Sequence, residues 1–319
     1  MRVLVATDLS ASADEAIRQA AALAGTGDVL GAVHVVPFLQ PVSALFPQTH
    51  AQDALDEAQM TIRLADAVNE RIARLVGRDA ETFIEQGTAD AEVLRRAETW
   101  KADVVVVGSH GESGAGRALG GVAERIVRRA HCSVLVTRAC LGGGGVLAAT
   151  DLLEPSLPVV AAAAEEARRR HVALTVVHAV DIPQDRESSL PAVVAGVGEA
   201  RRLEAAPKVA HVVDLTQLEA FFLAGLGTPT GTVPSSVRDA AHDRLATWMQ
   251  NAGVSANRRI LDGPAAVAIV REARHICADL IVVGSHGSTG FARIVLGDVP
   301  EEIVRAAPCS VLLVRFARS

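Results

Sequence analysis

Short apolar runs alternate with amphipathic segments along the whole chain. Residues 29–36 and 104–107 are rich in valine, a composition typical of strands that are buried on both faces. Residues 52–76 instead place apolar side chains at helical spacing along one side. The elements expected in the first half are strands at 3–7, 29–36, 81–85, 102–107 and 133–137, and helices at 11–24, 52–76, 90–99 and 122–130. This alternation predicts a parallel sheet with helices on each face.

The same pattern occurs twice. Val-Val-Gly-Ser-His-Gly begins at Val106 and again at Val282, and a Thr-Asp pair ends at Asp8 and at Asp151. These two motifs lie 33 residues farther apart in the second half, which therefore contains an insertion at about residues 182–235. A segment of this length serves either as a lid or docking element or as a cover for the sheet. We expect two α/β domains, residues 1–140 and 144–319, each a doubly wound five-stranded parallel sheet.

Composition narrows the classes of function. The 319 residues carry a formal net charge of -6, which provides no basic surface for the phosphates of nucleic acid. Aromatic residues make up 3% of the chain, so stacking platforms for single strands are also scarce. Charges interrupt every apolar stretch before the roughly 20 residues of a membrane span, and the N-terminal apolar run is too short for a signal peptide. The four cysteines show no zinc-ligand spacing and no disulfide framework. We expect a cytoplasmic protein without nucleic-acid or membrane partners.

A glycine-rich segment follows the fourth strand of each half. In an open parallel sheet, ligands bind beyond the carboxyl ends of the strands, where the strand order reverses. If the first and fourth strands flank that point, Asp8 and Gly108 line one crevice. Glycine allows close approach of the backbone to a ligand, and a helix that starts near Val122 presents free N–H groups to an anion. The plainer alternative is that the glycines only turn the chain from strand to helix, but the repetition of the loop favours a ligand. No Gly-Lys-Ser/Thr follows, so this is not a Walker A loop.

The strand ending in Thr-Asp, the Val-His-Val strand and the spaced loop glycines together resemble the universal stress protein family. The resemblance covers nearly the whole chain apart from the insertion. It implies a Rossmann-like fold of the adenine nucleotide alpha hydrolase type, with ATP as the bound cofactor, with or without Mg²⁺. It also implies a stress-response role as a sensor or adaptor, with at most slow ATP hydrolysis and no assigned catalytic residue.

The resemblance places adenosine against Asp8 and Val35, and the ribose and phosphates against the loop glycines and Ser109. His110 is either a general base or a residue that contributes only its backbone, and Arg117 either pairs with a phosphate or is solvated. The cofactor-binding set expected in the first half is Ala6, Thr7, Asp8, Val35, Gly108, Ser109, His110, Gly111, Gly114, Arg117, Gly120, Gly121 and Val122.

The two loops depart from the family's pattern in different ways. In the first, Gly121 stands where serine or threonine is expected, and the glycine spacing is one residue short. In the second, Asp298 takes that place and, with Glu301, is expected to cap the next helix. Two like charges about 4 Å apart repel by roughly 4 kcal/mol at an effective dielectric near 20, before screening. We expect the first half to bind the nucleotide, and the second to keep a weaker site at Asp151, Gly284, Gly287, Gly297 and Asp298.

The resemblance also implies an assembly. The last strands of the halves, residues 133–137 and 310–314, would pair and join the domains as an intramolecular pseudo-dimer; a further homodimer is left open. Two other functions compete with nucleotide sensing. One is a nucleotide-independent interaction scaffold. The other is an ATP-dependent ligase or amidotransferase of the PP-loop type, which is disfavoured because no Ser-Gly-Gly-x-Asp-Ser segment follows the first strand.

Overall fold

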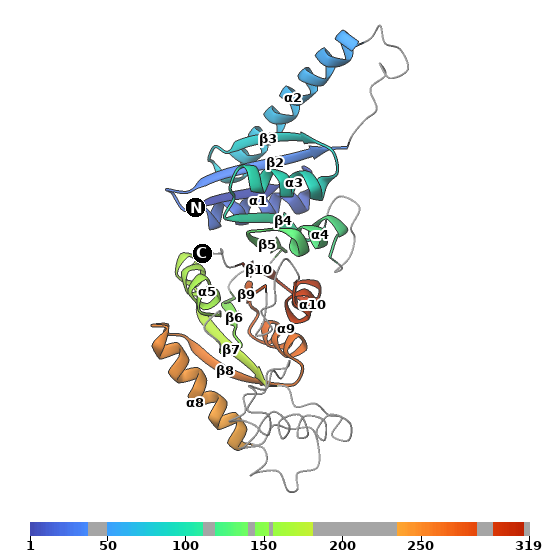
Figure 1. Ribbon diagram of the computed structural model, residues 1–319. Coiled ribbons are helices and arrows are strands. Elements are labelled where there is room, and N and C mark those ends of the chain that lie inside the picture. Colours follow the sequence, from blue (N-terminus) through green and yellow to red (C-terminus); the bar gives the residue numbers. More distant parts are fainter. Residues whose placement is uncertain are drawn as a thin grey trace, which may run out of the picture.

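The structure is a computed structural model that describes residues 1–37, 50–110, 119–139, 144–152, 156–180, 235–285 and 296–315. These residues form one ten-stranded sheet with helices on both faces (Figure 1). The insertion expected at about 182–235 lies outside the described residues, apart from its last position. Of the helices in the described ranges, none combines the length and apolar composition that a bilayer crossing demands.

The first half supplies five parallel strands in the order β3-β2-β1-β4-β5, as predicted. Its elements are β1 (Arg2–Ala6), α1 (Ala11–Leu23), β2 (Val29–Val36), α2 (His50–Val76), β3 (Glu81–Gln86), α3 (Ala89–Thr99), β4 (Val104–Gly108), α4 (Gly121–Arg129) and β5 (Ser133–Thr137). The predicted strands 29–36 and 133–137 match to the residue. The strand predicted from residue 102 begins at Val104, because the N–H of Ala102 still donates to Ala97 O at the end of α3, 2.8 Å away.

The second half repeats this arrangement in the order β8-β7-β6-β9-β10. Its elements are β6 (Val146–Ala149), α5 (Leu157–Arg170), β7 (Leu174–Val180), α8 (Ser235–Asn251), β8 (Asn257–Asp262), α9 (Ala265–His275), β9 (Leu280–Gly284), α10 (Asp298–Ala306) and β10 (Ser310–Val314). Two doubly wound α/β domains are therefore confirmed.

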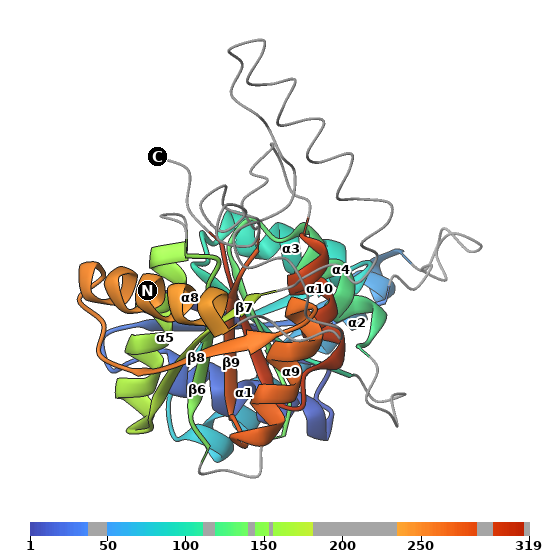
Figure 2. The same ribbon diagram turned by 90° about the horizontal axis from the view of Figure 1, so that it is seen from below.

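Each face of the sheet buries its own apolar layer. Because successive side chains of a strand point to opposite faces, Val3 and Val5 belong to one layer and Leu4 to the other. Helices α1, α2, α5 and α8 pack on the first face, and α3, α4, α9 and α10 on the second. In the second domain, Figure 2 shows α5 and α8 on one side of the sheet and α9 and α10 on the other. The carboxyl ends of the strands and the starts of the helices are left to form the candidate site.

Strands β5 and β10 join the two domains. They pair antiparallel, with Leu135 opposite Leu312 and Val136 opposite Val311. All four side chains are buried, so each domain covers the sheet edge that the other would expose. The pseudo-dimer through the two last strands is confirmed.

Candidate functional site

The turn after β1 places Asp8 at the carboxyl edge of the sheet. Leu9 adopts a left-handed backbone with φ 63°, a conformation that costs a non-glycine residue on the order of 1–3 kcal/mol. Two hydrogen bonds hold it: Leu9 N–H donates to Thr7 Oγ1 at 3.1 Å, and Ser10 N–H donates to Asp8 Oδ1 at 3.0 Å. The exposed Asp8 thus keeps its second carboxylate oxygen without a partner among the described residues.

A histidine from β2 supports the same turn. His34 Nδ1 donates to Thr7 O at 2.8 Å, and the half-buried Val35 follows it on the strand. In the second domain His178 makes the matching bond to Thr150 O at 2.9 Å, and Leu152 repeats the φ of 63°. Burial lowers the pKa of His178, so it stays neutral as the Nδ1–H donor. Both domains therefore fix the turn after their first strand in the same way.

The start of the glycine loop packs closely on α1. A Cβ added to Gly108 would lie 3.2 Å from His110 O, closer than side-chain carbon normally approaches, and 3.5 Å from Ser12 O, an ordinary contact distance. Ser12 Oγ donates to His110 O at 2.7 Å and so ties the turn after β1 to the loop after β4. These two segments converge as the sequence predicted. Ser12 was not among the predicted residues; the equivalent position in the second half is Pro155, which has no hydroxyl for such a bond.

The end of the loop leads directly into α4. Gly120 N–H donates to Ser109 O at 2.8 Å, which closes the loop at its base. Gly120 is the N-cap of α4, and no side chain caps the helix. The N–H groups of Gly121, Val122 and Ala123, in the first turn, lack intrahelical acceptors and are donors of the kind that can bind an anion. Gly111, Gly114 and Arg117 lie outside the described residues.

His110 has a buried ring nitrogen that is unpaired among the described residues. Its Nδ1 lies 2.9 Å from Ser109 Oγ, and its Nε2 has no hydrogen-bond partner in the part of the chain that the structure describes. Ser109 is buried and its N–H donates to Thr137 O at 3.0 Å, so its backbone is fixed by β5. An unpaired Nε2 is a group that could accept from, or donate to, a ligand oxygen or nitrogen.

The helix that follows the second glycine loop begins differently. The predicted cap by Asp298 is wrong: Gly297 is the N-cap of α10, Asp298 is the first helical residue, and no side chain caps the helix. Glu301 does not reach back toward Asp298, because it pairs with Arg128 and Arg305. Pro300, in the third helical position, has no N–H to offer. The first turn of α10 therefore has two N–H donors, those of Asp298 and Val299, beside the carboxylate of Asp298.

Asp151 is also less available than Asp8. Ser156 Oγ donates to Asp151 Oδ1, whereas no described side chain donates to Asp8. Gly284 ends β9 and Gly297 N–H donates to Ser285 O at 3.1 Å, so the base of the second loop closes like the first. Gly287 lies outside the described residues.

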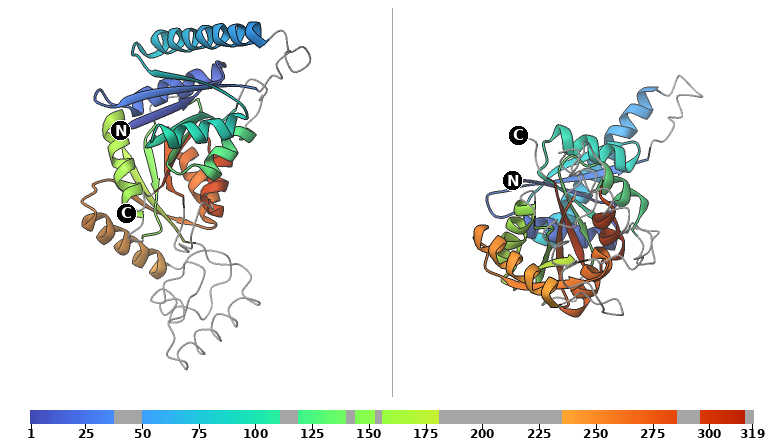
Figure 3. Two further views of the ribbon diagram at one scale, coloured as in Figure 1. Left: turned by 45° about the horizontal axis from the view of Figure 1, so that its top comes forward. Right: turned by 60° about the horizontal axis from the view of Figure 1, so that its bottom comes forward.

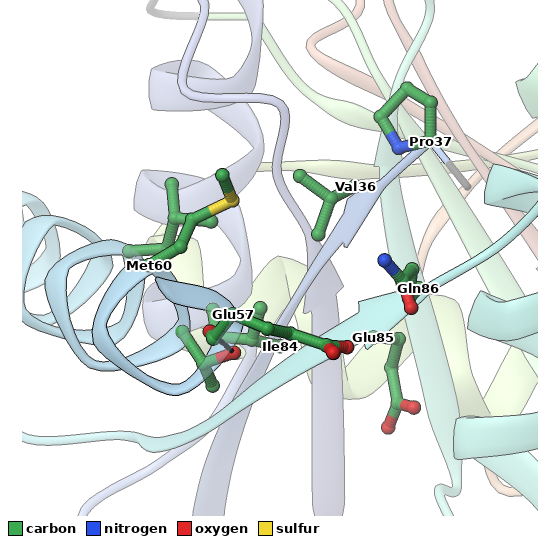
Figure 4. A pocket seen from close by; sticks show the side chains of 9 residues that line it. Val36, Pro37, Glu57, Met60, Ile84, Glu85 and Gln86 are labelled. Carbon is green, nitrogen blue, oxygen red and sulfur yellow. Dashed lines mark hydrogen bonds between the residues drawn. The ribbon is translucent and has the colours of Figure 1, made fainter. Parts of the chain in front are cut away.

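A pocket of about 110 Å³ lies close to Val35 but apart from this site. It opens between α2 and the carboxyl ends of β2 and β3, where Val36, Met60 and Ile84 line it (Figure 4). The first turns of α2 extend beyond the sheet there (Figure 3), and Met60 is exposed. None of the predicted cofactor-binding residues lines the pocket. Within the described ranges, no three His, Cys, Asp or Glu side chains gather as metal ligands.

Comparisons with known proteins cover almost the whole chain. A family model described as "Universal stress protein family" matches residues 1–138 and 145–315. A universal stress protein of Mycolicibacterium smegmatis is 26% identical over 98% of this chain and 96% of its own length. One of Methanocaldococcus jannaschii is 44% identical over 63 residues, which span 20% of this chain and 37% of that protein. The solved structure of a universal stress protein from Archaeoglobus fulgidus shares the fold, with a TM-score of 0.59 at 16% identity over 98% of both chains.

Proposed function

Because this chain belongs to the universal stress protein family, we propose that its first domain binds ATP and that the protein acts as a stress-response sensor or adaptor. The phosphates contact the free N–H groups at the start of α4. The adenosine lies between Asp8, which follows β1, and Val35, which lies near the carboxyl end of the neighbouring parallel strand β2. Mg²⁺, where present, accompanies the phosphates.

The observation that carries this proposal is the uncapped start of α4. Among the residues that the structure describes, three backbone donors in its first turn have no acceptor, and an unpaired carboxylate oxygen of Asp8 lies at the same edge of the sheet. Ser12 holds the two segments together through its 2.7 Å bond to His110 O. A phosphate satisfies the donors, and the positive end of the helix dipole favours its charge.

The first domain is favoured over the second for physical reasons. The first turn of α10 replaces one donor with Pro300 and adds the carboxylate of Asp298. Its Asp151 already accepts a hydrogen bond from Ser156. We therefore expect one nucleotide per chain.

Calorimetric titration of the full chain with ATP tests the proposal. The expected result is saturable heat at a stoichiometry near one, measured both with Mg²⁺ and with EDTA. A parallel titration with GTP controls for binding that depends only on phosphates. If ATP gives neither heat nor a thermal shift under either condition, the nucleotide proposal is wrong and the interaction scaffold replaces it.

Asp298→Asn is expected to open the second site. The substitution keeps the shape of the side chain and removes the charge that faces the two remaining donors of α10. Because Pro300 still lacks its N–H, we expect recovery of only about tenfold in affinity, equivalent to roughly 1.4 kcal/mol. Titration should show a second, weaker binding event, and Asp279→Asn, which changes a carboxylate elsewhere in the same domain, should not. A titration of Asp298→Asn identical to wild type would contradict the repulsion argument.

A further inference from the structure

Each domain inserts an arginine into the end of a helix of the other. Arg315, directly after β10, donates through Nη2 to Val127 O at 2.6 Å and to Arg128 O at 3.3 Å. Arg138, directly after β5, donates through Nη2 to Val304 O at 2.6 Å. The acceptors belong to the last turns of α4 and α10, where carbonyl groups lack intrahelical donors. The arginines therefore cap the carboxyl ends of α4 and α10, the two helices that follow the glycine loops.

The backbone fixes these arginines in place. Arg315 N–H donates to Ser133 Oγ at 3.1 Å, and Arg138 N–H donates to Ser310 Oγ at 3.0 Å. The bonds are reciprocal, because β5 and β10 pair antiparallel. Neither contact can form within one domain alone.

Arg315 is an expensive residue to place at this junction. Burial lowers the pKa of its guanidinium, and its Nε has no hydrogen-bond partner among the residues that the structure describes. In the described part of the chain it pairs with no carboxylate, so only backbone carbonyls and the helix dipole offset its desolvation. An apolar side chain would cover the same junction without the free-energy cost of desolvating a charge. The guanidinium is therefore best explained by its hydrogen bonds to the last carbonyl groups of α4.

Ion pairs also connect α4 with α10, and one of them involves Glu124, near the start of α4. Arg305 Nη2 lies 2.6 Å from Glu124, and Arg128 Nη2 lies 2.6 Å from Glu301. Glu124 follows the first three residues of α4, where its charge would oppose a bound phosphate. The second domain thus adds a cation, Arg305 Nη2 at 2.6 Å from Glu124 Oε1, to the one that α4 itself supplies, Arg128 Nη2 at 3.0 Å from the same oxygen. Figures 1 and 2 both show α4 beside α10.

We propose that the second domain is a positioning partner for the first domain's ligand site: Arg315 holds the carboxyl end of α4, and Arg305 adds to Arg128 of α4 in neutralising Glu124 at its amino end. This rests on the proposed function insofar as the ligand is ATP. The consequence is that α4 reaches its binding geometry only in the joined protein. The second domain then serves the first even where its own loop binds no phosphate.

The test uses full-length Arg315→Gln, with hydrogen exchange of the α4 amides measured without ligand. We expect the exchange rates of the α4 amides to rise about tenfold, because the end of the helix loses its hydrogen bonds to Arg315. The exchange rates in β8 and α9 should stay unchanged. Arg315→Lys, which keeps a charged donor, should recover part of the protection. The control is Arg271→Gln, because Arg271 also donates to a backbone carbonyl, Asp262 O at 3.1 Å, but within the second domain. Unchanged α4 exchange, or an equal rise throughout both domains, would overturn the positioning role.

ATP titration of the same variants separates the two proposals. Arg315→Gln should weaken affinity about fivefold. Arg305→Gln should weaken it about threefold at low salt and less at high salt, because screening removes the effect of Glu124. If wild type binds no ATP while α4 exchange responds as stated, the nucleotide assignment fails and the positioning role stands. If wild type binds ATP and neither variant changes affinity or exchange, the positioning role fails alone.

Discussion

Replacing Gly121 with aspartate is expected to weaken ATP binding by about 100-fold or more. The new carboxylate would stand at the first position of α4, among the donors assigned to phosphate. At an effective dielectric near 20, like charges about 4 Å apart repel by roughly 4 kcal/mol. If screening removes a third of this repulsion energy, the remainder still weakens the affinity for ATP about 100-fold, because each 1.36 kcal/mol changes the affinity tenfold. Calorimetric titration of the full chain measures the change.

The fold should tolerate this substitution. A Cβ at Gly121 would meet only Arg125 Nη1, at 3.2 Å, the far end of a flexible side chain. An acidic residue in the first turn also stabilises a helix, by about 0.3–1 kcal/mol. Lost binding would therefore not reflect lost structure, which the melting temperature can verify.

Gly121→Asn is the matched control, because it has the same shape without the charge. We expect it to lose less than about tenfold, and Gly121→Ser, which restores the hydroxyl of the family's pattern, to bind at least as well as wild type. Wild-type affinity in Gly121→Asp would show that phosphate does not contact the start of α4.

Gly31→Thr is expected to destabilise the first domain by about 2–4 kcal/mol, as overpacking in a buried site does. A Cβ at Gly31 would lie 2.8 to 3.2 Å from three ring atoms of Trp100, which is buried against β2. The indole cannot retreat freely: its Nε1–H donates to Glu81 Oε2 at 2.8 Å, and the Arg2 guanidinium lies 4.6 Å from its centroid. Urea unfolding of the full chain measures the loss.

The second domain shows how the same position can hold a larger side chain. Thr175 pairs with Leu147 on β6 as Gly31 pairs with Leu4 on β1, and it is buried. By alignment of Ala278 with Ala102, the place of Trp100 is taken by Ile276. The double variant Gly31→Thr/Trp100→Ile should therefore be more stable than the sum of its single changes, by about 1–3 kcal/mol. If the losses of stability in the two single variants simply add in the double variant, the side chains at positions 31 and 100 do not compete for the same space.

Local pattern predicted the fold well. Residues 29–36 and 133–137 were assigned as strands to the residue, because continuous apolar runs and adjacent turns are encoded within a few positions. The order of strands followed from the repeat and its resemblance. The cap of α10 was misplaced by one residue, because a cap depends on backbone angles that Gly297 and Asp298 both permit.

The candidate site was predicted only in outline. Asp8 and Gly108 were expected at one edge of the sheet, and Ser12 joins their segments through His110 O. Ser12 lies 98 residues from His110, and a lone serine near a helix start reads as part of an N-terminal cap. Its hydrogen bond from the first turn of α1 to the segment after β4 depends on a tertiary contact that no local pattern encodes.

The sequence by itself determined that this protein is a duplicated α/β unit whose two glycine loops have diverged, because periodicity and repetition are written along the chain. Only the tertiary structure decided how the copies depend on each other. Arg315 and Val127 are 188 residues apart, and their 2.6 Å contact exists because two edge strands pair antiparallel. The tertiary structure likewise decided that, among the described residues, the first turn of α4 has no side-chain cap and one oxygen of Asp8 has no partner.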